Sequence, residues 1–477
     1  MKKIVFVNPP LTLEERFGDF AKGGNIMPPL GICYLAAVTR KKYATKIIDV
    51  PAEGWGVERC AAEVLSKGFD CVCITTTTLS VYNAHKLATA IKENDPKITI
   101  IVGGPHISST AEETMERFKH FDVGVIGEGE PVVLNLFDAL DGSKPLEKIK
   151  GIVFRQGKKV IINQREEFIN DLDTLPLPAW DLLPHLKEKY KQLNYTFQSL
   201  PTGSLITSRG CPYQCRFCDT SVFGRVTRFH SVDYIMKMIE ELYFDYGVRD
   251  LVIYDDTFSL KKTRVIDICQ RMIGNYENLF WICNAKIGTL DFETLKLMKK
   301  AGCREIGYGI ESADEKILQF INKEVDLNKA KESLRLTKQA GISTKGYFIF
   351  GFPLETEESM KKTIDFALGS DLDTFQVNIF TPLPGCELYD EVIKYGSFDN
   401  DWEKMNLLNV LFIPHGLTKK GLEKYAFQAR RRFYFRPRVI WNHAKYMRKP
   451  KDFLNLYKAA YAFTKANIKE KINEYRN

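Results

Sequence analysis

Two series of short β-rich runs constrain this chain of 477 residues more than any other feature. Within each series, a segment of helix length separates one run from the next. In the first series the pattern predicts five strands, at residues 3–10, 45–50, 71–78, 98–104 and 122–130. Such alternation is typical of a parallel sheet with helices on both faces. We therefore predict an α/β protein whose N-terminal part is a Rossmann-like doubly wound parallel sheet.

The second series predicts six strands and follows a β-hairpin, expected at residues 151–163, and a proline-rich connector at 171–184. Six βα units are too few for a closed eight-fold barrel, so we predict a partial (β/α)6 TIM-like barrel. A helix-prone region follows it. The expected organisation is a Rossmann-like domain at 1–145, a hairpin and linker at 146–200, a barrel at 201–395 and a basic helical region at 396–477.

Polar and glycine residues follow each strand of the first series. In open parallel sheets, ligands bind outside the carboxyl ends of the strands. Five strand ends of this kind indicate a bound cofactor. The residues are Asn8, Asp49, Thr75 to Thr78, Gly103 with Gly104, and Gly127 with Glu128.

Three cysteines, Cys211, Cys215 and Cys218, lie within eight residues after the first strand of the second series. A structural zinc site usually takes four ligands in two separated pairs, and no fourth ligand stands at a suitable spacing. A disulfide framework does not suit a chain of this length with 11 cysteines. An iron–sulfur cluster held by three cysteines, with one iron left open, satisfies the spacing. We expect such a cluster, with zinc as the alternative.

The spacing Cys-x-x-x-Cys-x-x-Cys after a first barrel strand resembles the signature of the radical S-adenosylmethionine (radical SAM) superfamily. The resemblance implies that Cys211, Cys215 and Cys218 hold a [4Fe-4S] cluster whose open iron is chelated by S-adenosylmethionine (SAM). It implies reductive cleavage of SAM to a 5'-deoxyadenosyl radical, with the cofactor supplying the chemistry and the protein its position. It further implies an external electron donor of the flavodoxin or ferredoxin type, and sensitivity to oxygen.

The resemblance extends to the other strand ends of the barrel. From the residues alone, adjacent aspartates at a strand end also suit a helix N-cap, and residues 309–312 also suit a turn from strand to helix. The SAM contacts that the resemblance implies are Asp255 and Asp256 with the amino group, Glu311 and Ser312 with the ribose, and Phe217 and Gly351 with the adenine side.

The N-terminal domain resembles the cobalamin-binding domain of the cobalamin-dependent branch of this superfamily. The usual motif, Asp-x-His-x-x-Gly, is matched by residues 49–54 with Pro51 at the histidine position, so imidazole ligation of cobalt from that residue is excluded. The lower axial ligand is left open, and a scaffold domain without cobalamin is the alternative. The implied cobalamin contacts are Asp49, Gly54, Thr77, Leu79, Gly103, Gly104, Gly127 and Glu128.

The formal charge of +8 is concentrated at the C-terminal end, where residues 415–477 hold 17 Lys and Arg against four Asp and Glu. Aromatic residues interleave with these cations, a pattern that suits peripheral contact with a membrane surface or a solvated helical face. No apolar run reaches the ~18 residues of a membrane span. With no secretory segment visible, we expect a cytoplasmic protein with reduced thiols, and no nucleic-acid partner.

The resemblance implies an enzyme that methylates an unactivated carbon of a small-molecule or peptide substrate. One SAM methylates reduced cobalamin, and a second yields the radical that abstracts a substrate hydrogen. An oxidative cyclase similar to the anaerobic magnesium-protoporphyrin monomethyl ester cyclase is the alternative, because it shares this domain order. A non-catalytic cobalamin-binding or sensing protein is a third hypothesis. The substrate is not identified by a single sequence.

Overall fold

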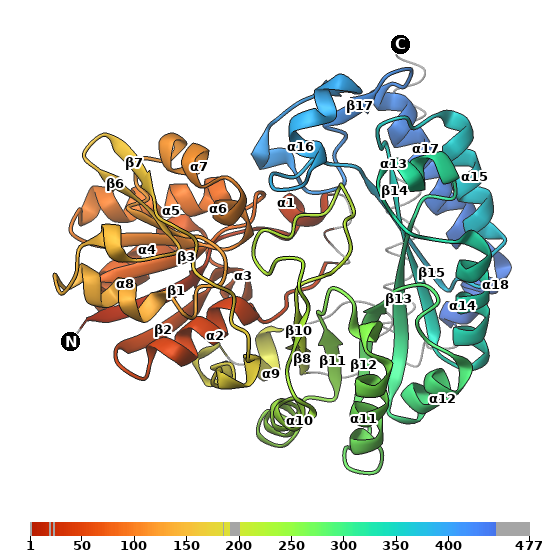
Figure 1. Cartoon of the computed structure of the whole chain (residues 1–477), viewed down its shortest axis with the longest axis horizontal. Coiled ribbons are helices and arrows are strands. Elements are labelled where there is room, and N and C mark those ends of the chain that lie inside the picture. The colour runs from red at the N-terminus through yellow and green to blue at the C-terminus, as the bar shows by residue number, and fades with distance from the viewer. Residues whose placement is uncertain (1, 19–20, 22–23, 185, 191–200, 445–477) are drawn as a thin grey trace.

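The computed structural model describes residues 2–18, 21, 24–184, 186–190 and 201–444 (Figure 1). Its first sheet has seven strands in the order β2-β1-β3-β4-β5-β6-β7, and the first five are parallel. The predicted doubly wound sheet is therefore confirmed. The five parallel strands are β1 (Lys3–Asn8), β2 (Ala44–Asp49), β3 (Cys71–Thr75), β4 (Thr99–Gly103) and β5 (Val123–Val125).

Helices cover both faces of this sheet because the strands bury apolar side chains on both sides. One face is covered by α2 (Leu30–Thr39) and α8 (Val133–Leu140), and the other by α4 (Val57–Lys67), α5 (Val81–Asn94) and α7 (Ala111–Arg117). Short helices follow three strand ends at the carboxyl edge, namely α1 (Leu13–Phe17) after β1, α3 (Val50–Glu53) after β2 and α6 (Pro105–Ser109) after β4.

The predicted hairpin is confirmed and extends the first sheet. Strands β6 (Ile152–Gln156) and β7 (Lys159–Ile162) pair with each other, and β6 pairs antiparallel with β5. The turn passes through Gly157, whose φ of 63° lies in the left-handed region. In the connector that follows, α9 (Leu186–Lys189) is the last described helix, and residues 191–200 lie outside the described part.

The second sheet has the six predicted parallel strands, in the order β15-β14-β13-β12-β11-β8. Its helices lie on one face, as expected for a partial barrel (Figure 1). The strands are β8 (Thr202–Leu205), β11 (Asp250–Ile253), β12 (Phe280–Ala285), β13 (Cys303–Glu311), β14 (Ser343–Phe350) and β15 (Thr374–Ile379). The helices are α10 (Val232–Glu240), α11 (Lys262–Met272), α12 (Phe292–Lys300), α13 (Glu315–Phe320), α14 (Leu327–Gln339) and α15 (Glu357–Leu368).

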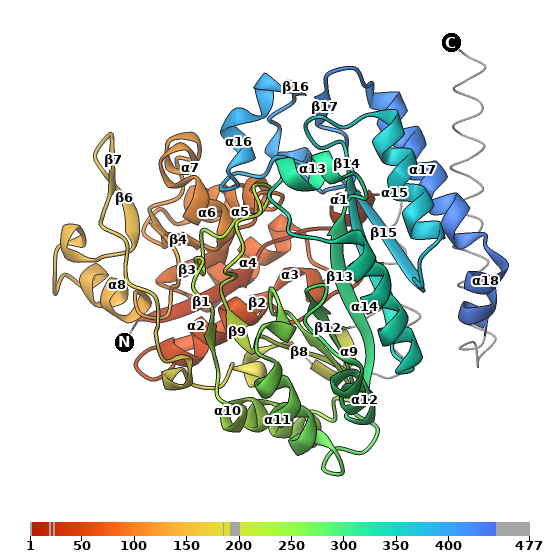
Figure 2. The ribbon, with the colours of Figure 1, turned by 45° about the vertical axis from the view of Figure 1, so that its right-hand side comes forward.

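The C-terminal region is not helical throughout, because after α16 (Leu388–Glu391) the strands β16 (Gly396–Phe398) and β17 (Phe412–Pro414) form an antiparallel pair. Between them, Trp402 is buried in the hydrophobic core of the first sheet. Helix α17 (Lys419–Tyr434) then runs beside α15 (Figure 2) and is followed by α18 (Pro437–Ala444). We also predicted that the basic residues beyond 444 belong to this helical region, and these residues lie outside the described part.

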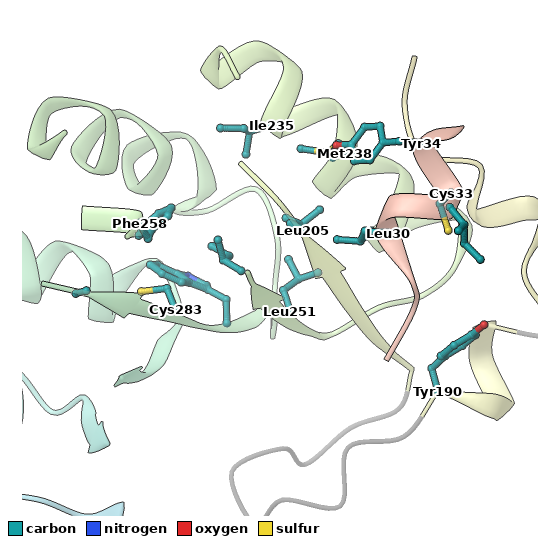
Figure 3. Close-up of a cluster of buried hydrophobic side chains, with 14 of the residues drawn as sticks. Leu30, Cys33, Tyr34, Tyr190, Leu205, Ile235, Met238, Leu251, Phe258 and Cys283 are labelled. Atoms are coloured by element: carbon teal, nitrogen blue, oxygen red, sulfur yellow. Dashed lines mark hydrogen bonds between the residues drawn. The ribbon is translucent and has the colours of Figure 1, made fainter. Parts of the chain in front are cut away.

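One hydrophobic core joins the two sheets. Leu30 and Tyr34 of α2 belong to the same buried cluster as Leu205 of β8 and Met238 of α10 (Figure 3). The Tyr34 hydroxyl lies 3.5 Å from the Met238 sulfur. The Rossmann-like domain is therefore packed directly against the first strand of the barrel, the strand that leads to the three cysteines.

Candidate active site at the carboxyl ends of both sheets

The three cysteines lie in the loop between β9 (Ser208–Arg209) and β10 (Arg228–Phe229), two short strands that pair antiparallel after β8. Gly210 opens the loop with φ of 87°, and a Cβ there would collide with the carbonyl oxygen of Val226, so only glycine fits. The Cys211 N–H donates to the Gly224 carbonyl at 3.3 Å and the Cys218 N–H to the Cys215 carbonyl at 3.1 Å. The backbone thus folds the loop back on itself.

Arg216, between the second and third cysteines, ties the loop to the barrel. Its N–H donates to the Ile321 carbonyl at 3.0 Å, which fixes the loop against the end of α13. Its guanidinium forms ion pairs with Glu387 at 2.6 Å and Glu391 at 2.7 Å, next to α16. These contacts position the cysteines without using any of their sulfur atoms.

All eleven cysteines of the chain are free thiols. Although Cys218 reaches solvent, desolvation raises the pKa of its thiol to about 12, and Asp256, Cys211 and Cys215 raise it further. Burial likewise raises the pKa of Cys215. Cys211 is among the groups that raise the pKa of both Cys215 and Cys218, so the three thiols are close neighbours, and a cationic iron centre would reverse these two shifts.

Within the described residues, no three His, Cys, Asp or Glu side chains are placed to hold a single metal ion. A [4Fe-4S] cluster makes a different demand, because each of its cysteines binds a different iron. The residues present fit such a cluster, since the three thiols are unpaired, mutually close and carried by one anchored loop.

The structure separates the roles of the two adjacent aspartates. Asp255 is buried, and its Oδ1 accepts from the N–H groups of Thr207 (2.6 Å) and Ser208 (3.0 Å), while Oδ2 accepts from the Ser208 hydroxyl at 2.7 Å. With both oxygens engaged, Asp255 fixes the chain ahead of the cysteines, and the SAM contact that we predicted for it stays a prediction. Asp256 is exposed and close enough to Cys218 to raise its pKa.

Glu311 ends β13 in an unusual conformation. Its φ of 67° is rare for a non-glycine residue, and the register between β13 and β14 shifts beside it. Its carboxylate, buried, pairs with the ammonium of Lys323 at 3.1 Å. Burial alone would lower the pKa of Lys323, but Glu311 and Cys215 outweigh it and raise this pKa. Sequence reasoning missed Lys323, because a single lysine after a short helix carries no signal of its own.

The remaining predicted SAM residues are placed as follows. The ring of Phe217 packs against Phe352, 5.4 Å between centroids, and Lys323 lies 6.0 Å from the Phe217 ring centroid. Ser312 is buried and accepts from the Asp314 N–H at 3.1 Å, so its hydroxyl faces the start of α13. Gly351 has φ of 86°, which favours glycine at this turn.

At the carboxyl edge of the first sheet, Asp49 is buried between two hydrogen-bond donors. It accepts from the Asn8 amide at 2.8 Å and from the Tyr190 hydroxyl at 2.7 Å. Desolvation raises the pKa of Asp49 to about 6, and these two hydrogen bonds oppose the rise. Pro51 lies in the first turn of α3, and Gly54 ends that helix with φ of 69°.

We expect an Asp49→Asn variant to change how stability depends on pH. A carboxyl whose pKa is about 6 when folded and about 3.9 when unfolded makes the folded state lose stability as pH rises between these values. The loss amounts to about 3 kcal/mol, and the variant lacks it. Urea unfolding of both proteins at about pH 4 and pH 7 measures the difference. Asp267→Asn, at an exposed position, is the control, and an equal pH dependence in wild type and Asp49→Asn would contradict the prediction.

The other predicted cobalamin residues lie in two neighbouring loops. Thr77 is exposed and its N–H donates to the Ser80 hydroxyl at 3.0 Å, whereas Leu79 is partly buried. Gly103 ends β4. Gly104 has φ of 103°, and a Cβ there would lie 2.8 Å from the Thr76 carbonyl oxygen, so glycine allows the two loops to approach.

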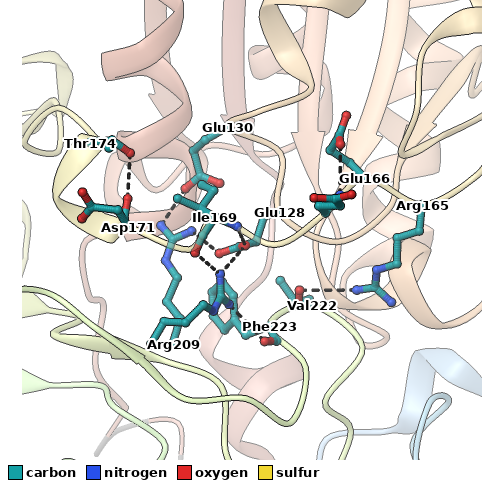
Figure 4. Close-up of polar contacts among 12 residues, drawn as sticks. Glu128, Glu130, Arg165, Glu166, Ile169, Asp171, Thr174, Arg209, Val222 and Phe223 are labelled. Carbon is teal, nitrogen blue, oxygen red and sulfur yellow. Dashed lines mark hydrogen bonds and ion pairs between the residues drawn. The ribbon is translucent and has the colours of Figure 1, made fainter.

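After β5, the loop that contains Gly127 and Glu128 turns toward the cysteine loop. The Gly127 N–H donates to the Ser108 hydroxyl at 3.0 Å. Glu128 is buried, and its two oxygens form ion pairs with Arg209 at 2.7 Å and Arg228 at 2.6 Å. These ion pairs join the two domains (Figure 4), and the cofactor contact that we predicted for Glu128 stays a prediction.

Arg209 also pairs with Glu130 at 2.7 Å. Its side chain is only 2% exposed and lies over the rings of Tyr34 and Phe223. Since Arg209 stands two residues before Cys211, a buried ionic cluster of the first domain borders the cysteine loop directly. Sequence reasoning missed this cluster as well.

Comparison with known families and proteins agrees with this geometry. The family model of the radical SAM superfamily matches residues 205–367, and that of the B12 binding domain matches residues 18–137. The B12-binding match therefore falls on the first sheet, and the radical SAM match falls on the second sheet.

Proteins similar to this chain over most of its length include an uncharacterized methyltransferase, PH0819, of Pyrococcus horikoshii. It is 34% identical, over 87% of this chain and 90% of that protein. The anaerobic magnesium-protoporphyrin IX monomethyl ester cyclase of Cereibacter sphaeroides is 28% identical, over 91% and 70% of the two chains. Among solved structures, the radical SAM methyltransferase TsrM of Kitasatospora setae has a TM-score of 0.66 at 17% identity, with 83% of this chain and 75% of that chain covered.

Proposed function

This chain belongs to the cobalamin-dependent branch of the radical SAM superfamily, and on this premise we propose that it methylates an unactivated carbon of its substrate. The observation that carries the proposal is the loop of three free cysteines, bordered by Asp256 and by the Glu311–Lys323 pair, beside the carboxyl edge of a B12-binding sheet. When bound, the [4Fe-4S] cluster supplies the electron that cleaves SAM, and cobalamin carries the transferred methyl group.

The chain's own residues bind and orient SAM. The thiolates of Cys211, Cys215 and Cys218 hold the cluster. The exposed Asp256 carboxylate accepts from the SAM amino group, since it lies beside Cys218. The Lys323 ammonium faces the SAM carboxylate.

The other SAM contacts support the nucleoside. The Glu311 carboxylate, held by Lys323, accepts from the ribose hydroxyls. Phe217 and Gly351 border the adenine, and Ser312 stays behind them as a support for the turn.

Cobalamin is bound along the carboxyl edge of the first sheet, where glycines and short side chains leave the backbone accessible. We keep the domain limits 1–145, 146–200, 201–395 and 396–477 as a working division, with the hairpin attached to the first sheet. The proposed contacts are Asp49, Gly54, Thr77, Leu79, Gly103, Gly104 and Gly127.

We expect cobalamin on this enzyme to have no imidazole from position 51 below the cobalt, because proline offers no side-chain nitrogen. Electron paramagnetic resonance (EPR) of the bound cob(II)alamin measures this directly. We expect no nitrogen superhyperfine splitting. Its presence would reveal a lower nitrogen donor and contradict the prediction.

Product analysis tests the proposed reaction. Methyl transfer is expected to yield S-adenosylhomocysteine and 5'-deoxyadenosine in step with the methylated product. Deoxyadenosine without any methylated product would instead favour a cyclase, as in the Cereibacter sphaeroides protein named above.

The external partners are also part of the proposal. A flavodoxin- or ferredoxin-like protein supplies electrons to the cluster, and the reduced thiols suit the cytoplasm. No helix in the described residues is long and apolar enough to cross a membrane.

We also propose contact with an anionic lipid surface at the end of the described chain. The exposed side chains there are Phe435, Ile440 and Trp441, together with the exposed Arg431. Co-sedimentation with anionic vesicles is expected for the wild type and reduced for Trp441→Ser.

A further inference from the structure

The connection between β16 and β17 reaches both sheets, and we call residues 399–411 the bridging loop. The Ile379 N–H, at the end of β15, donates to the Leu407 carbonyl at 2.9 Å. Toward the first domain, the Asn406 side-chain amide donates to the Glu15 carbonyl of α1 at 3.2 Å. In both views, α16 and the chain next to it lie beside α6 (Figures 1 and 2). The bridging loop therefore joins the barrel to the carboxyl edge of the first sheet.

Trp402 is the largest buried side chain of the bridging loop. Its indole lies in the hydrophobic core of the first sheet. The indole meets the His106 ring edge-on, with 4.5 Å between the ring centroids, and the Arg117 guanidinium lies 4.5 Å from the Trp402 ring centroid. The indole N–H donates to the Tyr389 hydroxyl of α16 at 3.3 Å. A side chain of the C-terminal region is thus fixed against the start of α6 in the first domain.

His106 connects the two loops that carry four of the proposed cobalamin contacts. It lies two residues after Gly104 and is 1% exposed, and its Nδ1 is 3.2 Å from the Thr78 hydroxyl. Its backbone N–H donates to the Thr76 carbonyl at 3.2 Å. Burial, together with the charge of Arg117, lowers the pKa of His106 to about 3, so the ring is neutral near pH 7. A neutral imidazole has one donor and one acceptor nitrogen, which suits a ring that lies between hydroxyl groups.

The fit of the indole limits how far the His106 ring can move. A smaller side chain in place of Trp402 would leave a cavity beside the imidazole, and the neighbouring side chains would fill it only in part. The ring would then be free to leave the Thr78 hydroxyl. Loops that spend only a tenth of their time in the binding arrangement bind their ligand about tenfold more weakly. A change at Trp402 is therefore expected to alter the affinity for cobalamin.

We propose that the bridging loop is part of the cobalamin site, and that Trp402 is a positioning residue that holds the loops of Thr77 and Gly104 in their binding arrangement through His106. This rests on the cobalamin contacts of the proposed function. The B12-binding sheet is then completed by the C-terminal region. Because the bridging loop is also hydrogen-bonded to the end of β15, it holds the cobalamin loops at a fixed place relative to the barrel.

Titration of the purified full-length protein with hydroxocobalamin, followed by its absorbance spectrum, tests the proposal. Trp402→Leu is expected to raise the Kd of cobalamin about 10-fold. Trp402→Phe keeps an aromatic ring against His106 and should bind nearly as tightly as wild type. A Kd of Trp402→Leu equal to that of wild type would overturn this inference and leave the proposed function intact, whereas a wild type that binds no cobalamin would overturn both.

Trp281→Leu is the matched control, because it makes the same change in the core of the barrel. Trp281 is 1% exposed, and its indole N–H donates to the Ala301 carbonyl at 2.8 Å. Urea unfolding measures the stability that each variant loses. An equal rise of the Kd in Trp281→Leu and Trp402→Leu would mean that Trp402 acts only through general stability, and would overturn the inference.

Hydrogen–deuterium exchange of the cobalamin-free protein tests whether the loops are held before the cofactor binds. Exchange over residues 75–80 and 103–107, where the His106 N–H is hydrogen-bonded, is expected to be faster in Trp402→Leu than in wild type and unchanged in Trp281→Leu. Equal exchange in Trp402→Leu and wild type would contradict the positioning role.

A double variant tests the route through His106. His106→Phe removes the contact with the Thr78 hydroxyl, so it is expected to weaken cobalamin binding by itself. Adding Trp402→Leu should then weaken binding no further, because both changes release the same loops. If the two rises of the Kd instead multiply in the double variant, Trp402 does not act through His106 and the proposal is overturned.

Discussion

A Cys218→Ala variant is expected to lose the iron–sulfur cluster and to form no 5'-deoxyadenosine above background. The cluster has only three protein bonds, so the loss of one thiolate leaves two ligands on a partly solvent-exposed centre. The loop itself should survive, because Arg216, Gly210 and the backbone hydrogen bonds hold it without any cysteine side chain. Iron and sulfide analysis, with EPR of the reduced protein, measures the effect.

Cys269→Ala supplies the matched control. Cys269 is a buried free thiol in α11 that packs in the hydrophobic core. Its replacement removes one sulfur from the core and is expected to lower stability modestly while the cluster stays complete. A Cys218→Ala protein with a full complement of iron and sulfide would refute the assignment of the cysteine loop.

Both sheets could be predicted from the sequence because their signal is local. Strands such as β4 and β14 are short apolar runs between helix-length segments, and their order in the chain implies parallel pairing. The signal of the cysteine loop is equally local, because the three cysteines lie within eight residues and their spacing can be read directly from the sequence. The antiparallel pair β16 and β17 escaped prediction, because two strands of three residues carry too little periodicity to be seen.

The roles of individual carboxylates could not be predicted, since each depends on a partner distant in the chain. Asp255 and Asp256 cannot be told apart in the sequence. Only the position of Thr207 and Ser208 shows that Asp255 is hydrogen-bonded to them, whereas Asp256 is exposed. The role of Lys323 depends on its ion pair with Glu311. The irregular end of β13 turns Glu311 toward Lys323.

Glu128 shows the same limit across domains. It follows a strand end with a glycine, a pattern that favours a cofactor contact in such sheets. Its partners Arg209 and Arg228 stand 81 and 100 residues later in the chain. The contact between the two domains, which no local pattern encodes, decides its role.

This contact leads to the second large effect that we expect. Arg209→Ala should lower the free energy of unfolding by about 3–5 kcal/mol, the usual cost of removing one partner from a buried ion pair. Glu130 would lose its ionic partner, and Glu128 would keep only Arg228, with all these side chains 7% exposed or less. The side chain also fills space between Tyr34 and Phe223.

Arg335→Ala, which breaks an exposed pair with Glu332, is the control and should leave the free energy of unfolding nearly unchanged, because solvent screens exposed ion pairs. A double-mutant cycle with Glu130→Gln and Arg209→Met, measured by urea unfolding, isolates the ionic contribution, because the effects of mutating residues in direct contact are not additive.

Since the cluster of charges joins the B12-binding sheet to the chain just before Cys211, its loss is also expected to loosen the cysteine loop. Faster proteolysis within residues 210–227 of Arg209→Ala, but not of Arg335→Ala, would show this coupling. Equal stability and equal proteolysis of the two variants would mean that the first domain does not support the cysteine loop through Arg209.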